Sequence, residues 1–402
     1  MGTRSDRYVA EIRRDGAVLS DELARAFAAV PREVFVGEGF QRRDGSWARP
    51  GDEGFLDTVY SDEVLVTKVD GKTPVSSSSQ PSLMAVMLTA LRVRPGLRVL
   101  EIGTGTGYNA ALLATLGAQV TSVDVQADVA RRASAALAAA GVGGVRVVHD
   151  DGYAPVPGDV VDRVIVTVGV AGLSPHWVAG LAGAGPLVVP VEHGGTHPVL
   201  VASPGPPGSD RPPGSDRQPG PSGPSGPDGP SGPDGPSGPS GPSARVLCPA
   251  GFMSAAGPLA AEHPGSHPRP AAARTLADFT EVAGPRWAAP LATLAYRDLW
   301  YAAGVRSRHA THAAVPGREQ SVLALLDERR TGGAVILPDG AIRAGGQQAQ
   351  EYAAEARTIL DEWESAGRPP MQAWQIGLAL TADPATPIWV PAHWRLQVPQ
   401  RR

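Results

Sequence analysis

The sequence predicts an α/β protein built on a doubly wound parallel sheet, and two observations lead to this class. Between residues 98 and 192, short apolar runs alternate with segments that have a helical pattern. A glycine-rich turn, LEIGTGTGYNA over 100–110, joins the first apolar run to the first of these helices. Strands that are separated by helices favour parallel pairing, because each crossover returns the chain to the same edge of the sheet.

The elements of this region follow from their apolar patterns. Strands are expected over 98–103, 118–125, 145–150, 162–170 and 185–192. Helices are expected over 106–116, 128–140 and 175–181. Two more strand patterns, 197–202 and 244–252, flank a tract of Gly-Pro-Ser and Gly-Pro-Asp triplets, and we interpret them as strands of one sheet. The tract, 203–243, is then a disordered insertion in a loop, which a fold tolerates because closure entropy grows slowly with loop length.

Residues 1–95 precede the glycine turn and are expected to form a cap over the substrate side of the core domain, 96–262. A helix is expected over 21–29, followed by the stretch VPREVFV. The stretch SSSSQPSLMAVMLTAL, 76–91, has the pattern of a helix with a serine cap and a proline in its first turn.

The sequence changes character beyond residue 270, where a smaller α+β module, 270–402, is expected. A hairpin is predicted over 334–343, around Pro-Asp-Gly. The segment 347–366 is predicted to be an amphipathic helix, and one face of it carries Tyr352, Ala356, Ile359, Leu360 and Trp363. Further strands are expected over 374–380 and 388–391.

Composition excludes several classes of protein. The 402 residues include 36 basic and 40 acidic ones, a net charge of −4, so nucleic acid is not an expected partner. Only Lys68 and Lys72 of the basic residues are lysine. A single cysteine, Cys248, rules out a disulfide framework, and His309 with His312 is too sparse for a metal site. We expect no metal, no membrane span and, without an apolar leader, a cytoplasmic location.

The glycine turn has three possible ligands. A phosphate loop would need a Gly-Lys-Ser/Thr ending, which is missing. A dinucleotide fingerprint fits loosely, and so does a turn for S-adenosylmethionine through Gly103, Gly105 and Gly107. Either reading uses Asp124 for ribose hydroxyls. Glu101 favours S-adenosylmethionine, because a carboxylate under the turn suits a cationic ligand and repels a pyrophosphate.

Other polar residues follow the strands at the same edge of the sheet. Thr104 lies within the turn, and Asp151 with Gly152 follows the third strand. Open α/β folds bind their ligands at the carboxyl ends of parallel strands. We therefore expect these residues in the cofactor site, with Asp151 near the adenine.

At this point the chain resembles the protein-L-isoaspartate O-methyltransferase family, over residues 20 to 255. The resemblance is carried by VLEIGTGTGYNAALLA (99–114), VPREVFV (30–36), VYSDEVL (59–65), SQPSLMAVM (79–87), VVHDDG (147–152) and DRVIVTVG (162–169). It implies a Rossmann-like, seven-stranded methyltransferase sheet and S-adenosylmethionine as the cofactor. Four consecutive serines, 76–79, depart from the family's more usual Thr-Ile-Ser.

The resemblance also implies a mechanism. A carboxylate acceptor is already a nucleophile at neutral pH, which suits a chain without a Ser-His-Asp or Cys-His constellation. Ser79 is expected to orient the acceptor, Ser78 to assist, and Asp62 and Tyr60 to lie near the mouth of the site. The ester that forms would collapse to a succinimide when the next backbone nitrogen attacks it.

Several functions stay open at this stage. The substrate is either isoaspartate in damaged proteins or an aspartate in a particular ribosomal peptide, and the C-terminal module resembles the layout of the peptide-tailoring branch. A small-molecule methyltransferase and a non-catalytic S-adenosylmethionine-binding scaffold are the alternatives. The oligomeric state cannot be derived from the sequence.

Overall fold

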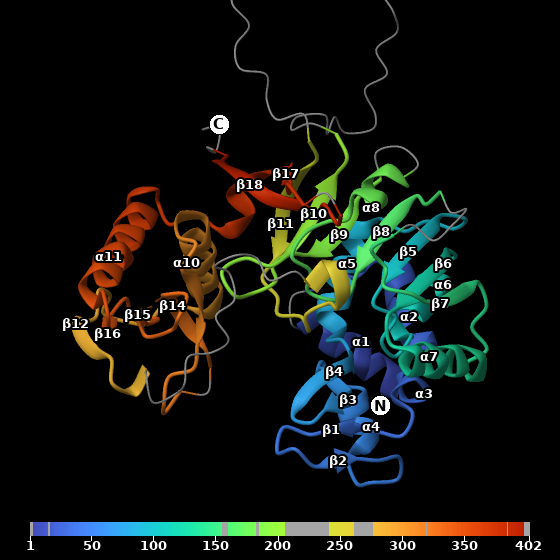
Figure 1. The fold of residues 1–402 in the computed structure, drawn as a ribbon. Coiled ribbons are helices and arrows are strands. Elements are labelled where there is room, and N and C mark those ends of the chain that lie inside the picture. Colours follow the sequence, from blue (N-terminus) through green and yellow to red (C-terminus); the bar gives the residue numbers. More distant parts are fainter. Residues whose placement is uncertain are drawn as a thin grey trace, which may run out of the picture.

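A nine-stranded sheet forms the middle of the molecule (Figure 1). The computed structural model describes residues 3–14, 17–154, 160–181, 185–205, 241–260, 276–318, 320–383 and 385–397. Most of the Gly-Pro-Ser tract, expected to be disordered, lies outside these residues. No helix in the described ranges is long and apolar enough to cross a membrane.

The order of the central sheet is β7-β6-β5-β8-β9-β10-β11-β17-β18. Its parallel half consists of β5 (Arg98–Ile102), β6 (Gln119–Asp124), β7 (Val145–His149), β8 (Arg163–Val166) and β9 (Leu187–Pro190). Its antiparallel half consists of β10 (Val199–Ser203), β11 (Ser243–Cys248), β17 (Trp374–Leu380) and β18 (Trp389–Leu396). The predicted Rossmann-like α/β class is confirmed, and so is the expectation that the two strands flanking the Gly-Pro-Ser tract belong to one sheet. The sheet has nine strands where seven were expected, because β17 and β18 extend it beyond β11.

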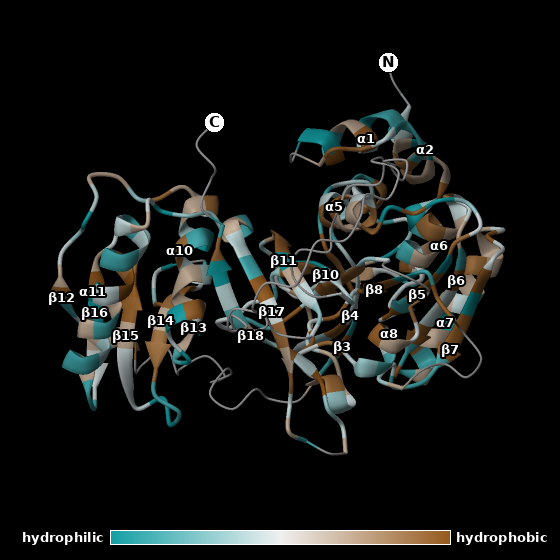
Figure 2. Cartoon of the chain, turned by 90° about the horizontal axis from the view of Figure 1, so that it is seen from above, coloured by the Kyte–Doolittle hydropathy of each residue, from teal (hydrophilic) through white to brown (hydrophobic). Residues whose placement is uncertain are grey.

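Helices cover both faces of this sheet, and its strands alternate between two apolar clusters. Val188 belongs to one cluster, whereas its neighbours Leu187 and Val189 belong to the other, as the period of a strand requires. The helices of this region are α5 (Pro81–Leu91), α6 (Tyr108–Thr115), α7 (Ala127–Ala139), α8 (Pro175–Ala179) and the short η1 (Gly257–Ala260). Figure 2 shows brown, hydrophobic residues along β11 in this sheet and along β14 and β15.

The N-terminal region adds helices and a small antiparallel sheet in the order β2-β1-β3-β4. Its elements are α1 (Arg4–Arg14), α2 (Asp21–Ala29), α3 (Arg32–Val36), β1 (Phe40–Gln41), β2 (Trp47–Ala48), α4 (Phe55–Val59), β3 (Leu65–Asp70) and β4 (Thr73–Ser78). The expected serine cap at 76–79 is wrong. Three of the serines lie in β4, and α5 begins only at Pro81, whose fixed φ suits the first helical position.

The C-terminal module packs two helices on a five-stranded antiparallel sheet of order β12-β16-β15-β14-β13. Its elements are β12 (Thr280–Ala283), α10 (Thr293–Arg306), β13 (Ala310–Ala313), β14 (Val322–Leu326), β15 (Gly332–Ile336), β16 (Ile342–Gly346), α11 (Ala349–Ser365) and η2 (Met371–Ala373). The predicted hairpin and amphipathic helix are confirmed, and all five residues of the predicted helix face are buried.

The last two strands differ from the expected layout. Both form where predicted, but β17 pairs with β11, so they extend the central sheet and do not join the module's own sheet. Ile376 and Leu378 are buried in the apolar cluster of the central sheet. The C-terminal segment is thus shared between two sheets, and a division at residue 270 cuts through one core.

Candidate functional site

A cavity of about 830 Å³ lies at the carboxyl ends of the first parallel strands. The glycine turn after β5 forms one wall of the cavity. Asp124 and Gln126, at the end of β6, form the adjoining wall. The serines 76–79 and the segment 251–256 line it as well. This is the edge at which open α/β sheets hold their ligands.

The glycine turn has a backbone that other residues adopt only at a cost. Gly103, Gly105 and Gly107 have φ values of +93°, +53° and +86°. A Cβ on Gly103 would lie 2.7 Å from Oγ1 of Thr167, and one on Gly105 would lie 3.2 Å from the carbonyl oxygen of Ser77. The second distance shows how closely the serine segment approaches the turn.

Asp124 ties the turn to the next strand. Its Oδ2 accepts a hydrogen bond from the amide of Gly105 (2.9 Å), and its Oδ1 accepts one from the amide of Gln126 (2.9 Å). The side chain lines the cavity and is mostly buried, and burial raises its pKa. Each carboxylate oxygen keeps acceptor capacity, so Asp124 can also accept from ligand hydroxyls.

Glu101 lies beneath the turn and is not among the residues that line the cavity. It is 0% exposed, and its carboxylate accepts hydrogen bonds from Asn109 Nδ2 (2.7 Å) and Ser122 Oγ (2.5 Å). Burial raises its pKa to about 7. Direct contact with a cationic ligand, as the sequence suggested, is therefore not the arrangement present. The carboxylate instead holds the base of the turn.

Thr104 continues the same buried chain of hydrogen bonds, because its Oγ1 lies 2.7 Å from Ser122 Oγ. Asp151 is exposed on the cavity wall, where its Oδ1 accepts from the amide of Tyr153 (2.8 Å). Gly152 is buried behind it with φ +73°, and a Cβ there would lie 2.9 Å from Ile102. Asp151 can therefore reach a ligand directly, whereas Gly152 shapes the turn.

Two of the predicted catalytic serines differ in what they contact. Ser78 is buried, and its Oγ accepts a hydrogen bond from Nε of Arg32 (3.3 Å). The Ser79 carbonyl accepts from Nη2 of Arg32 (3.0 Å), while the Ser79 hydroxyl is not hydrogen-bonded to any described residue. Both serines line the cavity, but only Ser79 keeps its hydroxyl for a ligand.

Arg32 lies behind the part of the cavity wall that Ser78 and Ser79 form, and it holds that part in place. The guanidinium is fully buried, and it also donates to the carbonyl oxygens of Val59 (2.9 Å), Ser61 (3.0 Å) and Glu63 (2.9 Å). Five donors in a rigid fork match this ring of oxygens, which a lysine could not do. Arg32 was not singled out from the sequence, where it is one of many arginines.

Asp62 and Tyr60 do not themselves line the cavity, and their expected place near its mouth stays a prediction. Asp62 lies behind the wall, where its Oδ2 accepts from Nε2 of Gln80 (2.7 Å), a residue that does line the cavity. Asp62 Oδ1 accepts from the amide of Ser82 (2.7 Å), and its Oδ2 accepts from the Ser82 hydroxyl (2.6 Å). The carboxylate thus caps α5, whose own N-cap residue, Gln80, makes no side-chain cap bond. Tyr60 donates its hydroxyl to Glu33.

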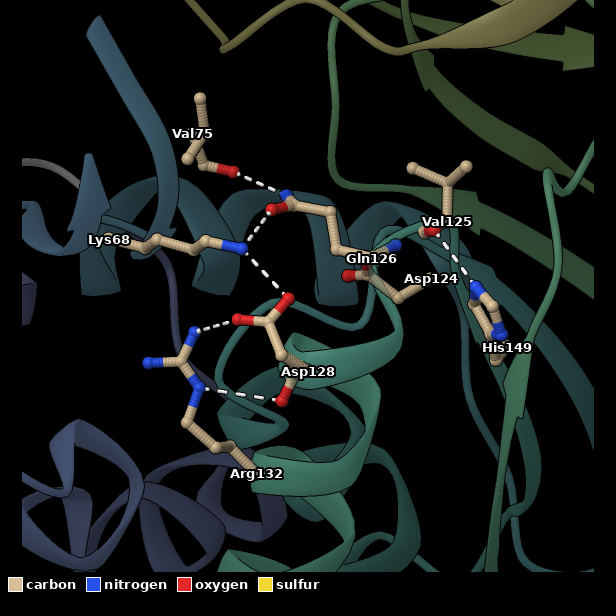
Figure 3. Close-up of polar contacts among 8 residues, drawn as sticks. All are labelled: Lys68, Val75, Asp124, Val125, Gln126, Asp128, Arg132 and His149. Atoms are coloured by element: carbon tan, nitrogen blue, oxygen red, sulfur yellow. Dashed lines mark hydrogen bonds and ion pairs between the residues drawn. The ribbon is translucent and has the colours of Figure 1, made fainter. Parts of the chain in front are cut away.

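Lys68 and Gln126 belong to the cavity wall and were missed (Figure 3). The Lys68 ammonium donates to Gln126 Oε1 and to Asp128 Oδ1, at 2.8 Å each. Gln126 in turn donates to the carbonyl of Val75 (2.8 Å). These bonds join β3 and β4 to the start of α7. Nothing in the sequence pairs residues that are about 60 positions apart.

The segment 251–256 was expected to be a strand in part, but β11 ends at Cys248. Phe252, Met253 and Ser254 instead line the cavity. The segment is fixed by the amide of Gly169, which donates to the Met253 carbonyl (2.8 Å).

His309 and His312, which were not expected to bind a metal, lie in the C-terminal module. His309 Nδ1 lies 3.2 Å from the carbonyl of Leu326, and His312 Nδ1 lies 2.8 Å from that of Gly195. In the described part of the chain, no group of three or more His, Cys, Asp and Glu side chains is placed to hold a metal.

Known proteins resemble the chain in both sequence and fold. The family model for protein-L-isoaspartate(D-aspartate) O-methyltransferase matches residues 3–203, half of the chain. The protein-L-isoaspartate O-methyltransferase of Thermotoga maritima is 36% identical over 178 residues, which are 43% of this chain and 51% of that protein. The chain thus spans about half the length of that relative.

Two more relatives extend the comparison. The protein of the same name from Methanoculleus marisnigri is 35% identical, over 47% of this chain and 76% of that one. A solved structure titled protein-L-isoaspartate O-methyltransferase has the same fold, with a TM-score of 0.51 and 22% identity over 98% of this chain and 100% of that one. The chain therefore belongs to the protein-L-isoaspartate(D-aspartate) O-methyltransferase family.

Proposed function

We propose that the protein methylates the side-chain carboxylate of isoaspartyl or aspartyl residues in polypeptides. The observation that carries this proposal is the free Ser79 hydroxyl on the wall of the cavity, on a segment that closely approaches the glycine turn. A hydroxyl can donate one hydrogen bond to a carboxylate and leave its other oxygen available for reaction.

The residues present fit the cofactor. The turn 103–107 offers a close backbone approach, and Asp124 offers acceptors for hydroxyls. When bound, S-adenosylmethionine supplies the methyl group. Glu101 keeps the turn in place through Asn109 and Ser122. Asp124, Asp151 and the turn glycines are thus the proposed cofactor residues, and Glu101 and Thr104 are positioning residues.

Ser79 is the proposed catalytic residue because, of Ser78 and Ser79, the two serines that the sequence assigns to catalysis, it is the one whose hydroxyl is not engaged. It would hold one acceptor oxygen and thereby aim the other, which is positional catalysis. The backbone at Ser79 is anchored by Arg32, so the hydroxyl is presented from a fixed support. No general base is required for an ionised carboxylate. The ester then loses methanol when the next backbone nitrogen attacks it, which gives a succinimide.

The experiment is methyl transfer from labelled S-adenosylmethionine to a linear isoaspartyl peptide. We expect Ser79→Ala to lower kcat/KM on the order of tenfold to a hundredfold while cofactor affinity stays unchanged. Ser134→Ala, which removes a hydroxyl bonded only within α7, is the matched control. Absence of transfer to any isoaspartyl or aspartyl polypeptide by the native protein would overturn the proposal.

The narrower choice between repair of damaged proteins and tailoring of one peptide is also a proposal. Repair is the reading that the names of the relatives support. The C-terminal module does not favour tailoring by itself, because the solved structure described above aligns over 98% of this chain. Activity on a cyclised peptide but not on linear isoaspartyl peptides would reverse this choice. The cytoplasmic location stays a prediction, which cell fractionation would test.

A further inference from the structure

A second cavity, of about 510 Å³, lies where the C-terminal module meets the central domain. Its walls come from the loop 195–198, from the segment 249–254 and from the first turns of α10. Gly251, Phe252 and Ser254 line both this cavity and the cofactor cavity. A polypeptide held at the first cavity therefore has a second surface beside it.

The charge of this second cavity differs from that of the chain. The whole sequence has a net charge of −4, but no described residue that lines the cavity is an aspartate or a glutamate. The polar lining includes Arg297, His197 and His312. A cavity of this composition favours an anion.

Arg297 is the residue best placed to bind that anion. The side chain is half-buried, and its guanidinium lies 4.9 Å from the centre of the Trp300 ring. In the described part of the chain it has no carboxylate partner. Its neighbour Asp298 instead accepts from the amide of Met371 (2.9 Å). Burial of this unpaired cation lowers its pKa, so a carboxylate that entered the cavity would compensate a charge that is already partly desolvated.

The rest of the lining suits a polypeptide better than a small free anion. Phe252, Trp300 and Tyr301 line the cavity, and Leu294 at its edge is 67% exposed. Aromatic and aliphatic groups around one arginine are typical of sites that bind a peptide side chain and its neighbours.

The walls are also held in place. Trp300 donates its indole N–H to the carbonyl of Gly194 (2.7 Å), and His312 bonds the carbonyl of Gly195 (2.8 Å). His193 bonds the carbonyl of Tyr301 (2.8 Å). A cavity whose walls are fixed before binding loses little entropy when it is occupied.

We propose that this second cavity is a subsite for an acidic side chain of the acceptor polypeptide, bound by Arg297, near the residue that is methylated. The proposal rests on the proposed function, because it takes the acceptor to be a polypeptide. It assigns to the C-terminal module a part in selecting the substrate.

The test uses the full chain and a set of isoaspartyl peptides in which a single glutamate moves through the flanking positions. A matched set carries glutamine instead. We expect at least one glutamate position to lower KM about three- to tenfold relative to glutamine, and we expect this preference to weaken as salt rises. In Arg297→Gln the preference should disappear, while KM for the glutamine peptides and the affinity for S-adenosylmethionine stay unchanged.

Two further variants separate charge from structure. Arg297→Lys should retain part of the preference, because the charge remains but the planar fork is lost. Arg306→Gln, on the same helix but ion-paired with Glu362 outside the cavity, should keep the full preference. Equal KM values for both peptide sets in the native protein, or a preference that survives Arg297→Gln, would overturn the proposal.

A binding experiment makes failure of the subsite distinguishable from failure of the proposed function. Peptides with asparagine in place of isoaspartate cannot be methylated, so calorimetry with these peptides measures binding without turnover, and the difference between their glutamate and glutamine versions reports the subsite. Tighter binding of the glutamate version that is lost in Arg297→Gln supports the subsite even if no turnover is found. Binding of inorganic phosphate at Arg297, with no difference between the two peptides, would reject a polypeptide subsite.

Discussion

Gly103 shows how one residue fixes the geometry of the site. Its φ of +93° is unfavourable for other residues, and an added Cβ would lie 2.7 Å from Thr167 Oγ1 and 2.9 Å from Val168 Cγ1. We expect Gly103→Ala to lower the free energy of unfolding by about 2–4 kcal/mol, from strain and crowding together. Chemical denaturation measures this change.

The control for Gly103→Ala is Gly96→Ala. Gly96 also has positive φ, +84°, but nothing lies within 4 Å of its added Cβ. That variant should lose only the strain, about 1 kcal/mol. Equal losses at the two positions would contradict the role of crowding.

The residues of the site could be predicted from the sequence only where a local motif specifies them. The turn glycines and Asp124 follow from a fixed spacing around one strand and the next. The position of Glu101 does not, because its partners Asn109 and Ser122 are 8 and 21 residues away. A carboxylate at the end of a strand can point into a cavity or beneath a turn, and only these neighbours decide which.

Among the elements, α5 depends on a carboxylate from outside the helix. Asp62 accepts from both the amide and the hydroxyl of Ser82. We expect Asp62→Ala to lower the free energy of unfolding by about 1–2 kcal/mol, as loss of an N-cap does. KM for the peptide and the affinity for S-adenosylmethionine should stay close to their native values, since Asp62 does not line the cavity and reaches its wall only through a hydrogen bond from Gln80.

Asp57→Ala is the control for this substitution, because it removes another carboxylate of the same region, from the first turn of the short α4. Its effect on stability should be smaller. A large loss of methyl transfer by folded Asp62→Ala would return this residue to the catalytic machinery.

The strands show the limit of pattern analysis for elements. Their positions were predictable because each carries an apolar run, and β15–β16 was predictable from its turn. The pairing of β17 with β11 was not, because Ser243 and Gly377 are partners across 134 positions of chain. Periodicity shows that a segment is a strand, but it does not show which sheet the strand joins.

At the scale of the whole molecule, the loop 192–196 of the central domain contacts the C-terminal module and holds the two parts together. Gly194 and Gly195 have φ values of +59° and +77° and present their carbonyls to Trp300 and His312. Across this contact, a Cβ on Gly304 would lie 2.4 Å from His193 Nε2. The two parts therefore meet with very little space between them. The second cavity depends on this contact, because residues of both parts line it. No sequence motif predicts the contact.

We expect His193 to make this contact dependent on pH. Its ring stacks on Tyr301, with 4.2 Å between centres, and burial lowers its pKa from 6.5 to about 4. The unfolded chain thus takes up a proton near pH 6.5 that the folded protein binds only near pH 4. The contribution of this histidine to the free energy of unfolding is therefore complete above pH 6.5. It is lost as the pH falls toward 4, and the loss amounts to at most about 3 kcal/mol.

Comparison with His193→Gln isolates this contribution from that of the neighbouring Glu192. Burial raises the pKa of Glu192 from 4.5 to about 8, so its contribution is complete below pH 4.5 and is lost as the pH rises through 8. Denaturation of both proteins between pH 4 and 8 gives the difference in the free energy of unfolding. We expect the advantage of the native protein to shrink as the pH falls below 6.5, because glutamine takes up no proton. If the two curves stayed parallel, proton uptake by His193 would not contribute to the pH dependence of this contact.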